Sequence, residues 1–241
     1  MLHHIGESKG KGLENWNIST SKFDLLLNLI EEKRFVTTTF EEIDKHPYQN
    51  LSKSIILTFD DCPISLFDYV IPELIKRKMK AVFSIPTAQI GGFNQWDVAE
   101  QDFAKVTLMN AEQLQYLANH GMEIASHGHQ HLRGKQISEK QFLQEITDSK
   151  KRLKNVLNKA VCTFTYPYGE VPKNYKDLLK KAGYRYGLSI YQASQNNFAL
   201  RRIGVHQTDT IKSISFKLSR NYQLMRVLLD PLLFFRSFLK V

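Results

Sequence analysis

Short apolar runs rich in β-branched residues alternate along the chain with longer amphipathic segments. The short runs predict strands, and the longer segments, in which apolar residues recur every three or four positions, predict helices. The expected strands are Ser54–Phe59, Lys80–Ile85, Met122–Ser126, Val161–Tyr166, Tyr186–Ile190 and Leu200–Val205. The expected helices are Leu66–Lys78, Ala111–Asn119, Ser138–Leu157 and Lys173–Ala182.

The order of these elements favours one α/β domain. Strands separated by helices are typical of a parallel sheet, either open or closed into a barrel. The segment before the first long strand fits the same domain, because Phe23, Leu27 and Ile30 recur at helical spacing and Phe35–Phe40 is strand-like. In such folds ligands bind where the strands end, so chemically active residues are expected directly after predicted strands.

The final segment, Tyr222–Val241, differs from the rest of the chain. It is rich in Leu and Phe, and residues 211–241 hold six Lys or Arg residues against one acidic residue, Asp230. Such a helix either packs on the domain or lies on an anionic membrane surface or a partner. We therefore separate a domain of residues 1–221 from residues 222–241, an amphipathic basic C-terminal helix or tail.

Composition narrows the class of protein. The chain has 241 residues, of which 42% are hydrophobic and 24% charged, and this excludes collagen-like, coiled-coil and disordered proteins. Its 33 basic and 24 acidic residues give a net charge of +9, which fits either an acidic partner or a solubilising basic surface. The interleaved basic and aromatic residues of a nucleic-acid binder are missing, so no nucleic-acid partner is expected.

The cysteine content and the search for a leader peptide indicate where in the cell the protein is expected. Cys62 and Cys162 cannot form a disulfide scaffold and fit a reducing compartment. The sequence shows no secretory signal and no run of about 18 apolar residues that would predict a membrane span. The expected location is the cytoplasm or the periphery of a membrane.

Two adjacent carboxylates, Asp60 and Asp61, follow the clearest predicted strand. A turn or a helix N-cap accounts for many such pairs. Two carboxylates this close also raise the pKa of one of the pair, unless a cation lies beside them. Because neighbouring strand residues point to opposite sides, one carboxylate can bind a metal while the other accepts a proton.

Three histidines follow another predicted strand, in the sequence Ser126-His127-Gly128-His129-Gln130-His131. His127 and His131 are four residues apart, so one helical turn brings both rings to one side and lets two nitrogens reach one ion at about 2.0–2.1 Å. His129 lies between them and is expected to face away.

Asp61 with the two outer histidines would supply three protein ligands. Structural zinc sites usually have four, whereas catalytic sites keep a position for water. The set therefore predicts hydrolysis, in which the ion lowers the pKa of its water and polarises a carbonyl while Asp60 takes the proton. A third cluster, Thr165-Tyr166-Pro167-Tyr168-Gly169, forms a turn that can aim a backbone N–H at an oxyanion, although alone it indicates only a turn.

These clusters, in this order, resemble the motifs of the polysaccharide deacetylase (NodB-homology) family, carbohydrate esterase family 4. The TFDD motif is matched by Thr58–Asp61, with Cys62 where Gly is common. The S-H-[ST]-x-x-H motif is matched by Ser126–His131, with Gly128 at the Ser or Thr position. The R-P-P-Y-G motif appears as T-Y-P-Y-G, without the arginine, and this variant is similar to a circularly permuted subgroup that carries Y-P-Y-G.

The resemblance implies a distorted (β/α) barrel of about seven parallel strands that hydrolyses acetyl groups, most often N-acetyl on an amino sugar. It implies Asp60 as the catalytic base and a divalent metal on Asp61, His127 and His131. Zinc suits this donor set, and cobalt, nickel or iron are alternatives. Pro167 and Tyr168 correspond to the part of the motif that binds substrate and the oxyanion.

Two further residues follow from the permuted subgroup. In its N-terminal motif a histidine protonates the leaving group, and the match is His3, with His4 and His206 as alternatives. Its arginine that steadies the catalytic aspartate matches Arg202. Two aromatic residues that can stack on sugar rings, or else belong to the core or rim, are Trp96 and Tyr166.

Other functions stay open at this point. An O-acetyl esterase, or a deformylase acting on a lipid-linked sugar, would use the same residues, and the basic C-terminal segment would suit a lipid-linked substrate. A carbohydrate-binding relative without activity would keep the fold. A phosphoryl-transfer enzyme would use the acidic pair but would leave the histidine pair without a role.

Overall fold

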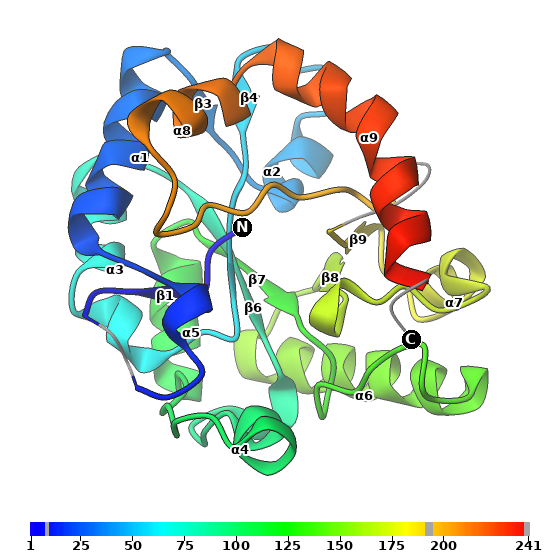
Figure 1. Ribbon diagram of the computed structural model, residues 1–241. Helices are drawn as coiled ribbons and strands as arrows, with labels where there is room; N and C mark the ends of the chain where they lie inside the picture. The colour runs from blue at the N-terminus through cyan, green and yellow to red at the C-terminus, as the bar shows by residue number, and fades with distance from the viewer. Residues whose placement is uncertain (8–9, 191–194, 239–241) are drawn as a thin grey trace.

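A five-stranded parallel sheet forms the centre of the computed structural model (Figure 1), which describes residues 1–7, 10–190 and 195–238, with side chains described as far as Asp230 at the C-terminal end. Its strands follow one another in the sheet in the same order as in the chain. They are β5 (Leu57–Asp60), β6 (Ala81–Ile85), β7 (Glu123–Ser126), β8 (Thr163–Thr165) and β9 (Tyr186–Leu188). Because all five are parallel, their carboxyl ends lie together at one end of the sheet.

Two further backbone segments join the edges of this sheet. At the β5 edge, Leu2 donates to the Thr58 carbonyl and accepts from the Asp60 N–H, both at 2.9 Å. Residues 200–205 then connect the two edges: the Leu200 N–H bonds to β9 at 2.8 Å, and the Val205 N–H bonds to Met1 at 3.3 Å. Among the described residues, five strands and these two segments therefore surround the interior, which confirms the prediction of a distorted barrel, although only five of its members are strands of the sheet.

The predicted strand Leu200–Val205 is wrong as a regular strand. It forms one isolated bridge, between Leu188 and Leu200, and otherwise crosses from one sheet edge to the other. The predicted strand Ser54–Phe59 is divided, because β4 (Ser54–Ile55) pairs with β3 (Val36–Thr37) while β5 pairs with β6. A second small parallel pair joins β1 (His4–Ile5) to β2 (Asn17–Ile18).

Helices surround the sheet, and their bounds agree largely with the hydrophobic periodicity (Figure 1). They are α1 (Thr20–Glu32), α2 (Phe40–Lys45), α3 (Val70–Lys76), α4 (Gln95–Gln101), α5 (Ala111–Asn119), α6 (Glu139–Leu157), α7 (Tyr175–Lys181), α8 (Ile211–Lys217) and α9 (Arg220–Phe238). The sequence did not predict α2, α4 and α8, whose six or seven residues give only about two helical turns of periodicity; α3 and α7 are equally short but lie within longer predicted segments.

Local capping signals determine where the best predicted helices begin. Ser138 caps α6 by accepting from the Gln141 N–H, and the Gln141 side chain accepts from the Ser138 N–H in return. This reciprocal pair satisfies two backbone donors at the helix start. The predicted helix Leu66–Lys78 is instead a 3-10 turn, Ile64–Phe67, followed by α3.

The core lies between the sheet and the helices. Phe23 and Leu27 on α1 are fully buried, and the Phe23 ring meets Phe59 of β5 edge-on at 6.1 Å. Phe59 in turn stacks on Phe83 of β6 at 4.9 Å. Since each such side chain contributes about 1.5–3 kcal/mol by leaving water, this aromatic row holds α1 against the strand that carries the acidic pair.

The C-terminal helix α9 packs on the barrel through a charged pair. Arg226 bonds to Asp230 one turn later and donates to the carbonyl oxygens of Arg202 and Ile190, at 3.3 and 3.0 Å. The opposite side of α9 exposes apolar residues, among them Leu228 at 74%. Within the described residues, no helix is long and apolar enough to span a bilayer. A separate role for residues 222–241, and their contact with a membrane, stay predictions; the side chains of residues 231–241 lie outside the described part.

Candidate active site

The chain reverses sharply where β5 ends, and this turn separates the two adjacent carboxylates. Asp61 and Cys62 both adopt left-handed backbone angles, with φ of 65° and 56°. This conformation costs residues other than glycine on the order of 1 kcal/mol or more each, so neighbouring contacts must hold it. The Cys62 N–H bonds to the Asp60 carbonyl at 2.8 Å, and the Cys62 carbonyl accepts from the Met109 N–H at 3.0 Å.

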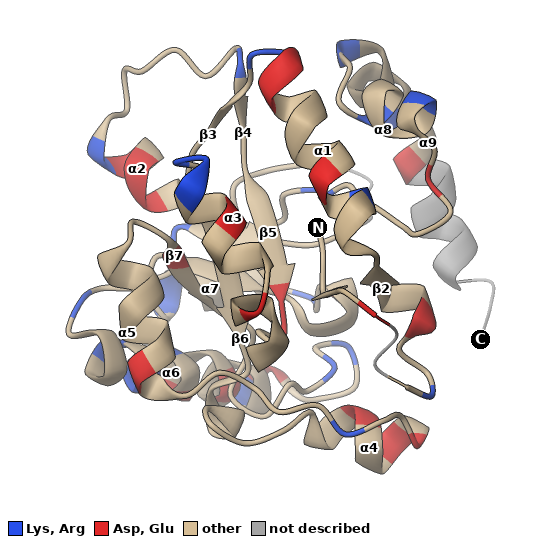
Figure 2. Cartoon of the chain, turned by 90° about the vertical axis from the view of Figure 1, so that its left-hand side faces the viewer, with Lys and Arg blue, Asp and Glu red and all other residues tan. Residues whose placement is uncertain are grey.

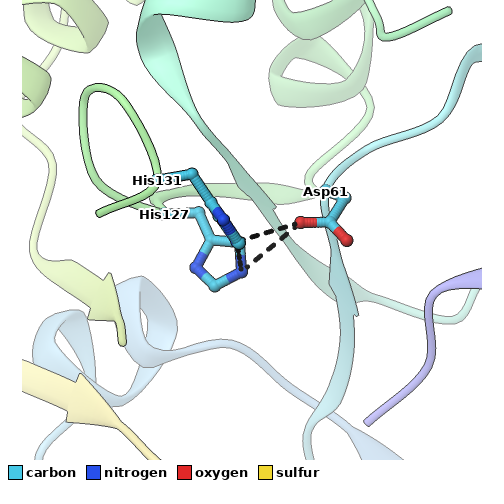
Figure 3. A group of neighbouring side chains, drawn as sticks. All are labelled: Asp61, His127 and His131. Atoms are coloured by element: carbon cyan, nitrogen blue, oxygen red, sulfur yellow. Dashed lines mark hydrogen bonds and ion pairs between the residues drawn. The ribbon is translucent and has the colours of Figure 1, made fainter. Parts of the chain in front are cut away.

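Asp61, His127 and His131 converge in space (Figure 3). Asp61 Oδ1 lies 3.5 Å from His127 Nε2 and 3.6 Å from His131 Nε2, and the two nitrogens are 3.3 Å apart. The His127 Nδ1–H donates to the Thr165 carbonyl at 2.9 Å, which leaves the Nε2 lone pair facing the other two groups. His129 takes no part in this group and instead contacts the Thr87 hydroxyl through Nδ1.

These three residues fit a divalent cation. Ligands at about 2.0–2.1 Å from a tetrahedral centre lie about 3.3 Å apart, close to the separations found here. Burial lowers the pKa of both histidines, so the neutral imidazoles that metals require are favoured. Burial, and then the charge of Asp60, raise the pKa of Asp61, whose Oδ1 has no hydrogen-bond partner among the described residues. A cation would supply the missing positive charge.

Beside this group, Asp60 forms a buried ion pair with Arg202. The guanidinium Nη1 and Nη2 contact the two carboxylate oxygens at 2.7 and 2.8 Å. Burial by itself would raise the pKa of Asp60, but the charge and hydrogen bonds of Arg202, together with the nearby His127 and His3, outweigh it and hold the pKa well below the usual range. His3 Nε2 lies 3.8 Å from Asp60 Oδ2, and burial lowers the pKa of His3 to about 3 although Asp60 opposes this shift.

Both groups open onto one cavity of about 240 Å³. Its walls include the predicted site residues His3, Asp60, Asp61, His127, His131, Tyr168 and Arg202. Tyr168 adopts a left-handed φ of 57° in the turn after β8, and its ring meets the edge of His131 at 4.8 Å. The ends of β5 and β7 and the turn after β8 therefore contribute to a single site.

Other predicted residues lie in different places. His4 also lines the cavity, whereas His206 is exposed and lies outside it. Pro167 is buried beneath the turn and is not part of the cavity wall. Tyr166 is completely buried, and its hydroxyl donates to the Phe198 carbonyl at 2.8 Å. Trp96 is almost as buried and stacks on His131 at 4.3 Å. Both rings border the cavity, but they expose almost no surface on which a sugar could stack.

Several cavity residues were not predicted from the sequence. Trp16 is 42% exposed at the cavity and lies 4.8 Å from the His3 ring. Asp97 and Gln101 come from the short helix α4, whose acidic positions are coloured red in Figure 2. Arg133 is not in the cavity wall, but it places its guanidinium 3.3 Å from the centre of the ring of Tyr168, which is part of that wall. These residues belong to no motif, and the folded chain alone brings them to the site.

Comparison with known proteins agrees with this arrangement. The family model for polysaccharide deacetylase matches residues 48–187, more than half of the chain. The chain belongs to the polysaccharide deacetylase family. It is therefore a hydrolase of carbon–nitrogen bonds other than peptide bonds. His3 precedes the matched region in the sequence and Arg202 follows it, yet both side chains line the site.

Individual relatives share about a quarter of their residues with this deacetylase. A poly-beta-1,6-N-acetyl-D-glucosamine N-deacetylase of Staphylococcus aureus is 24% identical, covering 81% of this chain and 70% of its own length. A putative polysaccharide deacetylase of Bacillus subtilis, YxkH, is 26% identical, covering 85% of this chain and 70% of its own.

Solved structures of low sequence identity share the fold. The Streptococcus pyogenes deacetylase PplD, in complex with acetate, aligns with a TM-score of 0.76 at 20% identity, covering 91% of this chain and 96% of its own. IcaB from Ammonifex degensii aligns with a TM-score of 0.72 at 19% identity, covering 90% and 94%. These likenesses agree with the curled parallel sheet described above.

Proposed function

We propose that the chain removes acetyl groups from the nitrogen of amino sugars in a glycan, with a divalent cation, most favourably zinc, held by Asp61, His127 and His131. One observation carries the proposal. The three ligand residues and the Asp60–Arg202–His3 group face the same cavity, so a cation, a proton acceptor and a proton carrier would meet one substrate.

The roles follow from position. Asp60 accepts the proton of the attacking water, while Arg202 holds both carboxylate oxygens in one orientation. When bound, the cation polarises the acetyl carbonyl and makes a neighbouring water more acidic, which a base as weak as Asp60 requires. The water oxygen forms a bond to the acyl carbon, the carbon–nitrogen bond breaks, and acetate and an amine result. His3 lies on the same cavity wall, 3.8 Å from Asp60, and delivers a proton to the departing nitrogen once the proton taken from water has reached its ring.

The proposed substrate class rests on the relatives and on one aromatic residue. A curated relative acts on poly-beta-1,6-N-acetyl-D-glucosamine, and we propose a related N-acetylated amino-sugar polymer for this chain. Trp16 presents a half-exposed ring beside His3, where the apolar face of a sugar can pack. An inactive carbohydrate-binding relative fits less well, because a complete set of acid–base and ligand residues surrounds the cavity.

Acetate release tests the proposal. Purified protein is assayed on poly-beta-1,6-N-acetyl-D-glucosamine and on lipid-linked N-acetyl and O-acetyl sugars, before and after chelation and after zinc is restored. We expect N-acetyl hydrolysis that chelation abolishes and zinc restores. Preference for O-acetyl sugars would favour the esterase alternative, and no release from any substrate in the presence of zinc would contradict the proposal.

Elemental analysis tests the ligand set independently. We expect about one cation per chain in the wild type and in His129→Ala, the matched control, because His129 lies outside the three-residue group. His127→Ala should lose the cation. Equal loading of His127→Ala and wild type would remove His127 from the ligand set.

A further inference from the structure

The loop that carries His131 follows β7 and contains two residues with left-handed backbone angles. It runs from His127 to Leu132, with a left-handed φ of 82° at Gly128 and of 63° at His131. Glycine adopts such angles freely, whereas histidine adopts them at an energetic cost. The His131 ring nevertheless lies within 3.6 Å of the other two ligand residues. Contacts from elsewhere must therefore fix the loop.

Glu145 on α6 supplies such contacts from beneath the loop. Its carboxylate is buried, and Oε1 accepts from the N–H groups of Gln130 at 2.6 Å and Leu132 at 3.4 Å. These two residues are the immediate neighbours of His131 in the chain. A carboxylate that accepts backbone N–H groups on both sides of a residue restricts where that residue can point.

Two features favour glycine at position 128: its left-handed φ of 82° and the closeness of the same oxygen. A Cβ atom on Gly128 would lie 2.9 Å from Glu145 Oε1, closer than such atoms come in proteins. The motif that the sequence resembles has Ser or Thr at this position, so in this chain the Glu145 carboxylate occupies space next to a missing side chain. Gly128 and Glu145 are therefore matched to each other.

We propose that Glu145 is a positioning residue for the metal centre, holding His131 toward Asp61 and His127 through the backbone of the loop. The inference rests on the proposed cation site. Residues that orient metal ligands typically change metal affinity 10- to 100-fold when they are removed. Glu145 makes no contact with the substrate cavity, so its effect should reach activity through the cation.

Zinc affinity tests the proposal. Competition with a chromophoric chelator is measured for wild type, Glu145→Ala, Glu145→Gln and Leu153→Ala. Leu153 is a buried core residue on the same helix, two turns farther from the loop, so Leu153→Ala controls for a general loss of stability. We expect zinc affinity to fall 10- to 100-fold in Glu145→Ala, less in Glu145→Gln, which keeps one acceptor oxygen, and within twofold of wild type in Leu153→Ala. Equal affinity in wild type and Glu145→Ala, or an equal loss in Leu153→Ala, would overturn the proposal.

A second measurement needs no metal and separates this inference from the proposed function. Amide hydrogen exchange of peptides covering residues 128–133 is followed in the chelated proteins. We expect faster exchange in Glu145→Ala than in wild type and no change in Leu153→Ala. If the wild type binds no zinc, the proposed function fails, and the exchange data still decide whether Glu145 anchors the loop. Unchanged exchange in Glu145→Ala would refute the anchoring.

Discussion

Replacing Arg202 by Met should destabilise the protein strongly, because it leaves the buried carboxylate of Asp60 without a partner of opposite charge. Arg202 is 7% exposed and contacts both oxygens of Asp60, the Thr58 hydroxyl at 3.3 Å and the Ser189 carbonyl at 3.2 Å. Removing one partner of a buried ion pair costs about 3–5 kcal/mol, because the other charge is left without compensation. Asp60→Asn should cost a comparable amount, since it leaves the guanidinium buried and unpaired.

The double variant Asp60→Asn with Arg202→Met distinguishes pairing from packing. If the charges depend on each other, the double variant should be destabilised by clearly less than the sum of the two single changes. Urea unfolding of the chelated proteins measures each free energy. The exposed pair Lys11–Asp102 serves as the control and should contribute much less, because water screens both charges. Additive single effects, or an Arg202→Met cost no larger than the control, would refute the reasoning.

Three further predictions concern the reaction, the substrate and pH. Asp60→Asn should retain the cation by elemental analysis while the rate of acetate release falls at least ~10²-fold; an unchanged rate would remove Asp60 as the base. Trp16→Ala should raise KM for the glycan roughly 2- to 10-fold with little change in kcat, as lost ring stacking predicts, and an unaltered KM would place the sugar elsewhere. Burial raises the pKa of Glu123, at the start of β7, from 4.5 to about 7, so its contribution to stability is present below pH 4.5 and is lost as the pH rises to 7. In urea unfolding of chelated protein, Glu123→Gln should therefore gain about 3 kcal/mol relative to wild type across this interval, and a constant difference would contradict the burial argument.

Hydrophobic periodicity and capping signals act over a few residues, and for that reason they located most of the strands and long helices. Ser138 with Gln141 marks the start of α6 in both the sequence and the structure. The same patterns predicted that chemical groups would follow the strands, and Asp61, His127 and His131 do converge there. The seven residues of α4 were too few to show a helical period. The apolar pattern of residues 200–205 was misleading, because this segment connects the sheet edges instead of forming a regular strand.

By itself the sequence determined an α/β barrel, the family, and a set of metal-ligand candidates, because each of these depends on residues close together in the chain. The resemblance singled out Arg202 and not its neighbour, and the tertiary structure gives the physical reason: Arg201 pairs with Asp230 on α9, while Arg202 turns inward to Asp60, 142 residues away. The tertiary structure also exposes the ring of Trp16 and buries that of Trp96, and it places Glu145 beneath the loop of residues 127–132. These placements depend on how the closed barrel brings distant backbone segments together. A local pattern of side chains contains no information about that closure.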